Sequence, residues 1–394
     1  METIVKKIFL GFVASAVAVV ASGNAGAQQV RGVYPDKVVF GMQTDLSGPV
    51  ANVGVAQSNA IRMRFDEVNQ AGGVHGRKLE LVVEDSGYQI PKAVQAVNKL
   101  INRDKVFALI GSMASGPNNA TLPTQIAANV PNLFPNAATR SMFEPHHKLK
   151  FANLVTYMDQ ARSSVKWMVE QRGVKKVCVL AIKSDMGDEV FEGVVQQSKV
   201  HNLPAPEVAY HRPTDVEFSA SVMKMKDAAC GGLILGTLAR DTVGILSAVK
   251  ALRWDIPVIG AAASQEPAVV EAPGGIAEGF MVASLMNTAY SDDQNKQAAA
   301  WVQRYEARYK QHPSVYGQWA YTWADLTVKG LQNAGRNLNV DTFVAGLEAI
   351  KDYQDIFGSP RLSFGKSQHM GASAIFLVAV KNGRFVRITD PLKL

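Results

Sequence analysis

The sequence is poor in cysteine, with only Cys178 and Cys230 among its 394 residues. It has no C-x-x-C pair and no H-E-x-x-H motif, so the common spacings of zinc and redox sites are missing. We therefore expect neither a metal nor a cofactor. The two cysteines could pair in an oxidising compartment or stay separate as buried thiols, because a sequence does not give the distance between their Cα atoms.

Charge of one sign is not concentrated anywhere in the chain. The net charge is +7 and charged residues make up 19% of the sequence. No basic run with interleaved aromatic residues occurs, although a nucleic-acid-binding surface needs a clustered basic patch. We do not expect nucleic acid as a partner.

Long uncharged apolar runs are confined to the N-terminus, at residues 8–21. Two lysines precede this run, and Ala25-Gly26-Ala27 follows it. This is the layout of a secretory signal peptide spanning residues 1–27, although a buried N-terminal helix would be an alternative. The run is short for a transmembrane helix, which needs about 20 residues. We expect an exported, periplasmic protein that is not itself inserted in the membrane.

Catalytic motifs are also missing. No G-x-S-x-G elbow and no G-x-G-x-x-G after a strand are present. Phe364-Gly365-Lys366-Ser367 is similar to the end of a phosphate loop, but Pro360 stands where the first glycine is required. We expect no enzyme. The remaining enzymatic alternative is an esterase using Ser115, for which no base is visible at a suitable spacing.

Strand–helix units fill most of the chain. Continuous apolar runs predict strands buried on both faces, which are typical of parallel sheets, and amphipathic helices alternate with them. The predicted strands are Val38–Met42, Leu79–Val83, Val106–Ile110, Val177–Ile182, Leu233–Leu235 and Val258–Ile259. Three helices (292–311, 316–334, 340–350) and two strands (374–380, 384–388) follow. About 365 residues remain after the signal peptide, which favours two domains.

Two segments that follow predicted strands are candidate binding elements. Ser115-Gly116 lies where a helix should begin, and Asn136-Ala137-Ala138-Thr139 follows the next strand. Open α/β sheets bind ligands beyond the carboxyl ends of their strands, and a helix start with a hydroxyl favours an anion. The alternative is that Ser115 and Thr139 only cap helices.

The order of motifs identifies a family. The motifs are Asp45-Leu46-Ser47-Gly48-Pro49, then Asn69-Gln70-Ala71-Gly72-Gly73-Val74-His75-Gly76-Arg77, then Ile110-Gly111 with Ser115, then Ala137-Ala138-Thr139. The chain resembles the type I periplasmic binding proteins of ABC importers, in the leucine/isoleucine/valine-binding branch, over essentially its whole mature length. The resemblance implies an α/β fold with two similar lobes, each a parallel-rich sheet flanked by helices, joined by three hinge crossovers. It implies one lobe of residues 34–154 and 285–365 and another of residues 155–284 and 366–394.

The resemblance also implies a ligand site. Ser115, Ala137 and Thr139 match the family positions that hold the ligand's α-carboxylate, and we include the flanking Ala114 and Gly116. The family's ammonium-binding glutamate is not matched, because residues 260–264 read Gly-Ala-Ala-Ala-Ser, with Ala262 among them and no acid before Glu266. The family's tyrosines are not matched either. At those positions this sequence has Val53, Met186 and Leu238, the last beside Thr237.

These departures predict a carboxylate ligand without an α-amine and with an aliphatic or aromatic body, since an ammonium buried without its carboxylate is costly. Import of a branched-chain or other amino acid is one alternative, and a ligand-sensing module for a receptor is another. The expected partner is a membrane permease, and the expected state is a monomer. Residues left open between a ligand role and a surface or core role are Arg140, Arg240, Tyr88, Tyr316 and Trp319.

Overall fold

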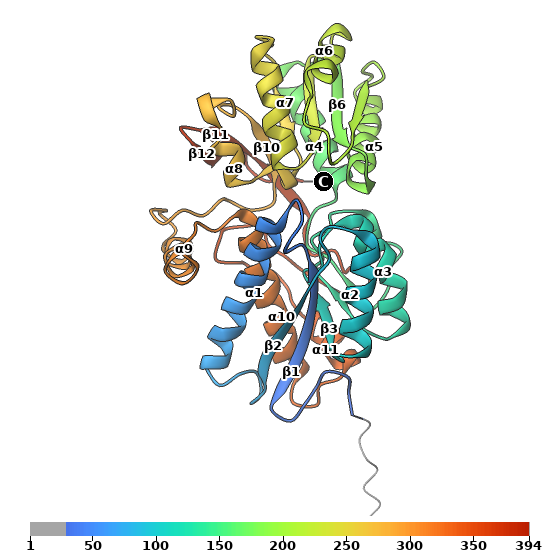
Figure 1. Ribbon diagram of the computed structural model, residues 1–394, viewed down its shortest axis with the longest axis vertical. Helices are drawn as coiled ribbons and strands as arrows, with labels where there is room; N and C mark the ends of the chain where they lie inside the picture. The colour runs from blue at the N-terminus through green and yellow to red at the C-terminus, as the bar shows by residue number, and fades with distance from the viewer. Residues whose placement is uncertain (1–28, 394) are drawn as a thin grey trace, which may run out of the picture.

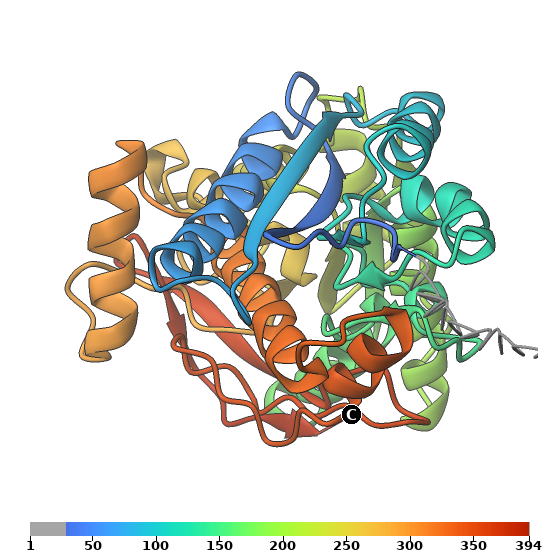
Figure 2. The same cartoon turned by 90° about the horizontal axis from the view of Figure 1, so that it is seen from below.

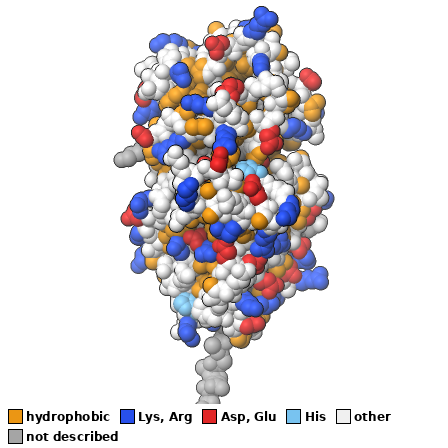
Figure 3. Space-filling view, turned by 90° about the vertical axis from the view of Figure 1, so that its left-hand side faces the viewer, with side chains coloured by type: hydrophobic (Ala, Val, Ile, Leu, Met, Phe, Trp, Pro, Cys, Tyr) orange, Lys and Arg blue, Asp and Glu red, His pale blue; other side chains and the backbone are white. Residues whose placement is uncertain are grey.

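The computed structural model describes residues 29–393, so the predicted signal peptide lies outside the described residues. The chain forms two lobes stacked along its long axis, each built on its own sheet (Figure 1). On the face drawn in Figure 3, acidic and basic side chains are interspersed over both lobes.

The first lobe is built on a parallel sheet of five strands in the order β2-β1-β3-β4-β5. Its strands are β1 (Lys37–Thr44), β2 (Lys78–Asp85), β3 (Ala108–Ile110), β4 (Asn132–Leu133) and β5 (Lys150–Phe151). Its helices are α1 (Ala51–Gln70), α2 (Ile90–Asn102), α3 (Ser115–Ala127), the short η1 (Arg140–Met142), and the late α9 (Lys296–Tyr309), α10 (Val315–Ala334) and α11 (Val340–Glu348). Helices α1 and α10 lie side by side on one face of the sheet, with α2 and α3 on the other (Figure 2).

The second lobe is built on a sheet in the order β12-β11-β10-β9-β8-β6-β7, with β13 paired to β11. Its strands are β6 (Val177–Ile182), β7 (Val208–His211), β8 (Gly232–Gly236), β9 (Val258–Gly260), β10 (Met281–Ser284), β11 (Ala374–Lys381), β12 (Arg384–Arg387) and β13 (Leu392–Lys393). Its helices are α4 (Tyr157–Arg172), α5 (Asp185–Val200), α6 (Ser219–Asp227), α7 (Ala239–Ala251), α8 (Pro267–Val270) and the short η2 (Ala262–Ser264) and η3 (Pro273–Gly275). The neighbouring strands β7, β6, β8, β9 and β10 pair in parallel. Strand β11 pairs antiparallel with both β10 and β12.

The strand sequences explain this architecture. Every residue of β6 and of β8 is buried, as expected for apolar strands that are covered by helices on both faces. Helix α4 begins after Thr156, whose hydroxyl accepts the backbone N–H of Asp159, and ends at Gly173 in the left-handed conformation with φ 64°. The predicted fold class is therefore confirmed.

The chain passes between the lobes three times, in residues 152–156 between β5 and α4, 285–295 between β10 and α9, and 349–373 between α11 and β11. The first and third crossovers run side by side, because Ala152 pairs with Met370. The backbone N–H of Ala152 donates to the carbonyl of His369 at 2.9 Å, and Gly371 donates to Ala152 at 2.8 Å.

The two cysteines form a disulfide, with their Cα atoms 5.9 Å apart. Cys178 lies in β6, and Cys230 precedes β8, its neighbour in the sheet. The bond therefore fastens two adjacent segments inside the second lobe. Among residues 29–393, no helix combines the length and the apolar character that crossing a membrane requires.

Candidate ligand-binding site

A narrow hollow lies where the two lobes face each other, with room for about one water molecule between its walls. The first lobe contributes Asn136 and Ala138 after β4, and Tyr316 and Trp319 from α10. The second lobe contributes Tyr157 and Gln160 from α4, and Ala262 and Ala263 from η2. Leu154 and Leu285 complete the lining from two crossovers. None of these side chains carries a charge.

Hydrogen bonds hold the wall made by η2 in place. The buried Gln160 accepts the backbone N–H of Ala262 at 2.8 Å and donates to the carbonyl of Val155 at 2.6 Å. Tyr316 donates its hydroxyl to the carbonyl of Ala263 at 3.0 Å, which links α10 of one lobe to η2 of the other. Burial raises the pKa of the Tyr316 hydroxyl, so it stays protonated and able to donate.

The two candidate segments of the first lobe lie next to each other. Residues 113 and 136 form a parallel bridge, and Ala114 donates its backbone N–H to the carbonyl of Asn136 at 3.0 Å. Ala114 adopts the left-handed conformation with φ 70°, which marks the sharp turn into α3. The structure thus brings the segments around Ser115 and Thr139 together, as the strand-end argument predicts.

Neither hydroxyl caps a helix. Ala114 is the residue that precedes α3, and the start of α3 has no side-chain cap. Thr139 precedes η1, but its hydroxyl bonds to that of Ser141 at 3.0 Å instead of capping η1. Ser115 and Thr139 are 8% and 3% exposed. The capping alternative is wrong for both residues. Neither Ser115 nor Thr139 is among the residues that line the hollow, although Asn136 and Ala138 of the second segment are.

The other predicted residues are placed unevenly around the hollow. Ala262 lines it, whereas Ala137 packs against Met142 and Ala152, and its neighbour Ala138 takes the place in the lining. Val53 and Met186 are both 7% exposed and belong to the apolar core. Further residues that lie outside the lining are Gly116, half-buried against Ile90, and Tyr88, half-buried after β2.

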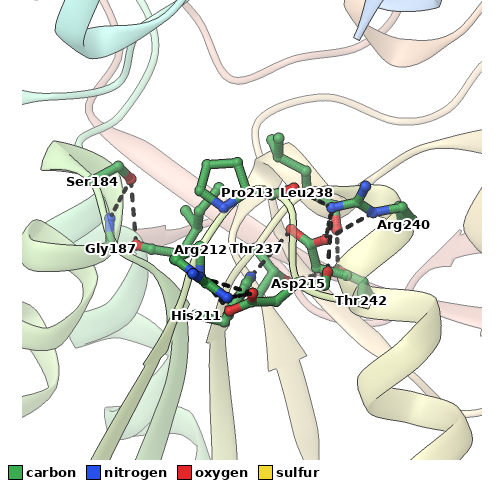
Figure 4. Close-up of polar contacts among 12 residues, drawn as sticks. Ser184, Gly187, His211, Arg212, Pro213, Asp215, Thr237, Leu238, Arg240 and Thr242 are labelled. Carbon is green, nitrogen blue, oxygen red and sulfur yellow. Dashed lines mark hydrogen bonds and ion pairs between the residues drawn. The ribbon is translucent and has the colours of Figure 1, made fainter. Parts of the chain in front are cut away.

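The facing edge of the second lobe carries a polar cluster (Figure 4). The Thr237 hydroxyl lies 2.7 Å from that of Thr242, so it is already partnered, and Leu238 beside it is half-buried. His211 at the end of β7 lies 3.2 Å from the buried carboxylate of Asp241. Arg240 bonds the same carboxylate at 2.9 Å, so it serves the lobe's own structure. Of these contacts, only the one between His211 and Asp241 joins residues that are distant in sequence.

Polar contacts hold the lobes together around the hollow. Arg140 donates its backbone N–H to Glu189 at 2.8 Å, and its guanidinium pairs with Glu192 at 3.2 Å. Asn119 of α3 donates to Asp185 of α5 at 2.7 Å. Arg140 therefore bridges the lobes and is not simply a solvated surface residue. Burial raises the pKa of Glu189 to about 7.

Glu266 is the first acid after β9, and it is not among the residues that line the hollow. Its side chain is 3% exposed, and Asn52 at the start of α1 donates to its Oε2 at 3.4 Å. Its Oε1 has no partner among the described residues. Burial raises the pKa of this carboxyl to about 8. Glu266 thus contacts the first lobe and leaves the wall formed by Ala262 and Ala263 uncharged.

Residues 37–384 match the model of a family described as periplasmic binding protein. Two curated relatives are similar over most of their length. The leucine-, isoleucine-, valine-, threonine-, and alanine-binding protein of Pseudomonas aeruginosa is 24% identical over 324 residues, which cover 82% of this chain and 83% of the relative. The leucine-specific-binding protein of Salmonella typhimurium is 22% identical over 352 residues, 89% of each chain.

Solved structures share the fold. A fatty acid ABC transporter substrate-binding protein from Thermomonospora curvata superposes with a TM-score of 0.84 at 21% identity, covering 93% of this chain and 95% of its own. A branched chain amino acid ABC transporter from Thermus thermophilus with bound valine superposes with a TM-score of 0.82 at 19% identity. The superposition covers 91% of this chain and 97% of the Thermus thermophilus chain. At these identities the likeness shows the two-lobed architecture.

Proposed function

The chain belongs to the periplasmic binding protein family, and from this we propose that it captures a small carboxylate without an α-amine for an ABC importer. The uncharged lining of the interlobe hollow carries this proposal. A buried ammonium group needs a paired carboxylate, and among residues 29–393 no acidic side chain is part of the lining of the hollow.

The carboxylate end of the ligand is assigned to the first lobe. The adjacent segments that carry Ser115 and Thr139 offer two buried hydroxyls beside the turn at Ala114. Hydroxyl and backbone N–H donors suit a desolvated carboxylate, because hydrogen bonds to a charged acceptor are the strong ones. The rings of Tyr316 and Trp319, 4.8 Å apart, then suit an aliphatic or aromatic body.

The alternative within the same class is import of an amino acid. It is favoured by the relatives from Pseudomonas aeruginosa and Salmonella typhimurium, which are named as binding proteins for leucine and, in the first case, for other amino acids as well. The fatty acid protein among the structural relatives favours an acid without an amine. Closure of the lobes about the three crossovers would present the liganded surface to a membrane permease, and catalysis has no part in this proposal.

The experiment is a thermal-shift screen of residues 28–394 after unfolding and refolding, which removes any carried-over ligand. The panel pairs each amino acid with its deaminated acid and adds benzoate and cinnamate. A ligand at 100 times its Kd adds about 2.7 kcal/mol of stability. Stabilisation by amine-free acids supports the proposal, whereas stabilisation by amino acids alone contradicts it and supports the alternative.

We also propose that the protein is exported by the segment at residues 1–27 and acts in the periplasm as a monomer. N-terminal sequencing of protein recovered from the periplasm should begin near Gln28, and light scattering should give the mass of one chain. Recovery of the uncleaved chain in the cytoplasmic fraction would contradict the export part.

A further inference from the structure

A second small space lies where the three crossovers meet, between them and α10 of the first lobe. Its lining includes Leu154 of the first crossover, Leu285 of the second, Ala372 of the third, and Trp319 and Thr322 of α10. It has room for about one water molecule, and we call it the junction space. Internal spaces with apolar walls stay dry, whereas polar ones hold ordered water, so the polar groups on these walls decide what the space binds.

The hydroxyl of Thr322 has no partner among residues 29–393, although Thr322 is only 1% exposed. Thr121 and Thr327, which are as deeply buried in their helices, donate their hydroxyls to the carbonyl four residues earlier, at 2.9 and 2.8 Å. Thr322 makes no such bond. Because an unpaired buried hydroxyl lowers stability, we expect its partner to come from outside the chain.

Two further polar groups border the same space. The indole N–H of Trp319, three residues before Thr322 on α10, also has no partner among the described residues, and Trp319 is 3% exposed. Asn153 of the first crossover accepts the indole N–H of Trp323 on its Oδ1 at 2.8 Å, which leaves the amide N–H₂ group as a donor. A buried water makes about three hydrogen bonds, so these three groups match the needs of one water molecule.

A bound cation fits this space less well than a water molecule does. Asp355 is the one ionisable residue of the lining, and its carboxylate is already paired. The Ser359 hydroxyl donates to Oδ2, and the backbone N–H groups of Phe357 and Ser359 donate to Oδ1 at 2.9 and 3.1 Å. The indole and amide N–H groups are donors, whereas a hard cation needs oxygen ligands. The walls therefore favour a neutral molecule that can accept hydrogen bonds.

We propose that the junction space binds one permanent water molecule, which accepts the N–H groups of Trp319 and Asn153 and pairs with the Thr322 hydroxyl. The water ties the first crossover to α10. Asn153 is then held on α10 twice, directly by Trp323 and through the water. The first crossover is thereby fixed at its first-lobe end, and it turns beyond Asn153 when the lobes open. This inference does not depend on which ligand the protein binds.

The test is urea unfolding of residues 28–394 without added ligand. Thr322→Val keeps the shape of the side chain and removes its hydroxyl. With the water in place, this variant removes one of the water's partners and should lower the urea midpoint. Without the water, it would remove an unpaired buried hydroxyl, so a midpoint that stays or rises would overturn the inference. The matched control is Thr214→Val at an exposed loop position, which should leave the midpoint unchanged.

Crystal structures of the wild type and of Thr322→Val locate the molecule directly. The wild type should show a density peak within hydrogen-bonding distance of both Thr322 Oγ1 and Trp319 Nε1, and the variant should show this peak weakened or lost. A wild-type junction space without a peak, or one filled by a side chain, would overturn the inference. The wild-type map remains decisive if the variant does not fold.

Discussion

Glu266 should make the closed arrangement of the lobes sensitive to pH. Its carboxyl is buried where η2 and α8 of the second lobe meet the starts of α1 and α10 of the first, with Tyr316 as the titratable group facing it. The pKa of this carboxyl is raised by burial from 4.5 to about 8. In the closed fold the group is therefore protonated at neutral pH, whereas an exposed glutamate is ionised.

Because the pKa of Glu266 is higher in the folded protein than in an exposed glutamate, the stability of the folded protein falls as the pH rises. The closed, folded state binds the proton more tightly, so its stabilisation is complete below about pH 4.5 and is lost as the pH rises to about 8. Each pH unit in that window costs about 1.4 kcal/mol. Raising the pH from about 6 to about 8 should destabilise this arrangement by about 2 kcal/mol. The effect should appear either as a lower free energy of unfolding or as opening of the lobes.

The assay compares wild type with Glu266→Gln by urea unfolding and small-angle scattering across this pH range. The glutamine variant cannot ionise at position 266, so its urea midpoint and radius of gyration should change less than those of wild type as the pH rises. The remaining change comes from Glu189 between the lobes, whose pKa is raised to about 7 and which titrates in the same window. The matched control is Glu271→Gln, the same change at an exposed position five residues further along, which should behave as wild type. If wild type and Glu266→Gln respond to pH in parallel in both measurements, the reasoning is refuted.

Three further predictions concern the site and the disulfide. Thr139→Ala should weaken carboxylate binding at least tenfold in calorimetry, since a hydrogen bond to a charged group contributes about 1.5–3 kcal/mol, while the exposed Ser247→Ala should not; equal affinities would remove Thr139 from the site. Ala262→Glu should abolish binding of amine-free acids by placing an unpaired charge in the lining, and unchanged binding would show that the ligand lies elsewhere. Replacing Cys178 and Cys230 by alanine should lower the unfolding free energy by about 4 kcal/mol, because the bond closes a separation of 52 residues, and an unchanged urea midpoint would contradict this.

Strands with an apolar run of their own were predictable, and β5 was not. Val177–Ile182 is predicted from its uninterrupted apolar run and is observed as β6. Strand β5 has only two residues, Lys150–Phe151, too few for any periodic pattern. It exists because β4 beside it in the sheet supplies its hydrogen bonds, so only the assembled sheet shows it.

Some residues of the candidate site were predictable from the sequence, and others were not. Ser115 and Thr139 were predictable because each follows a strand, and the ends of parallel strands meet at one edge of a sheet. Leu154, Leu285 and Gln160 carry no local signal, since an apolar residue on a crossover and an amide on a helix are common everywhere. Their place in the lining depends on three distant segments converging at the hinge.

By itself, the sequence determined the alternation of strands and helices, the two-lobed family fold and the anion-favouring segments after β3 and β4, because these depend on residues that are close along the chain. Only the tertiary structure decided that Cys178 meets Cys230 and that Glu266 is buried against the other lobe. Those features depend on distances between segments that the chain brings together only by folding, and burial, charge pairing and cavity shape exist only once it has done so.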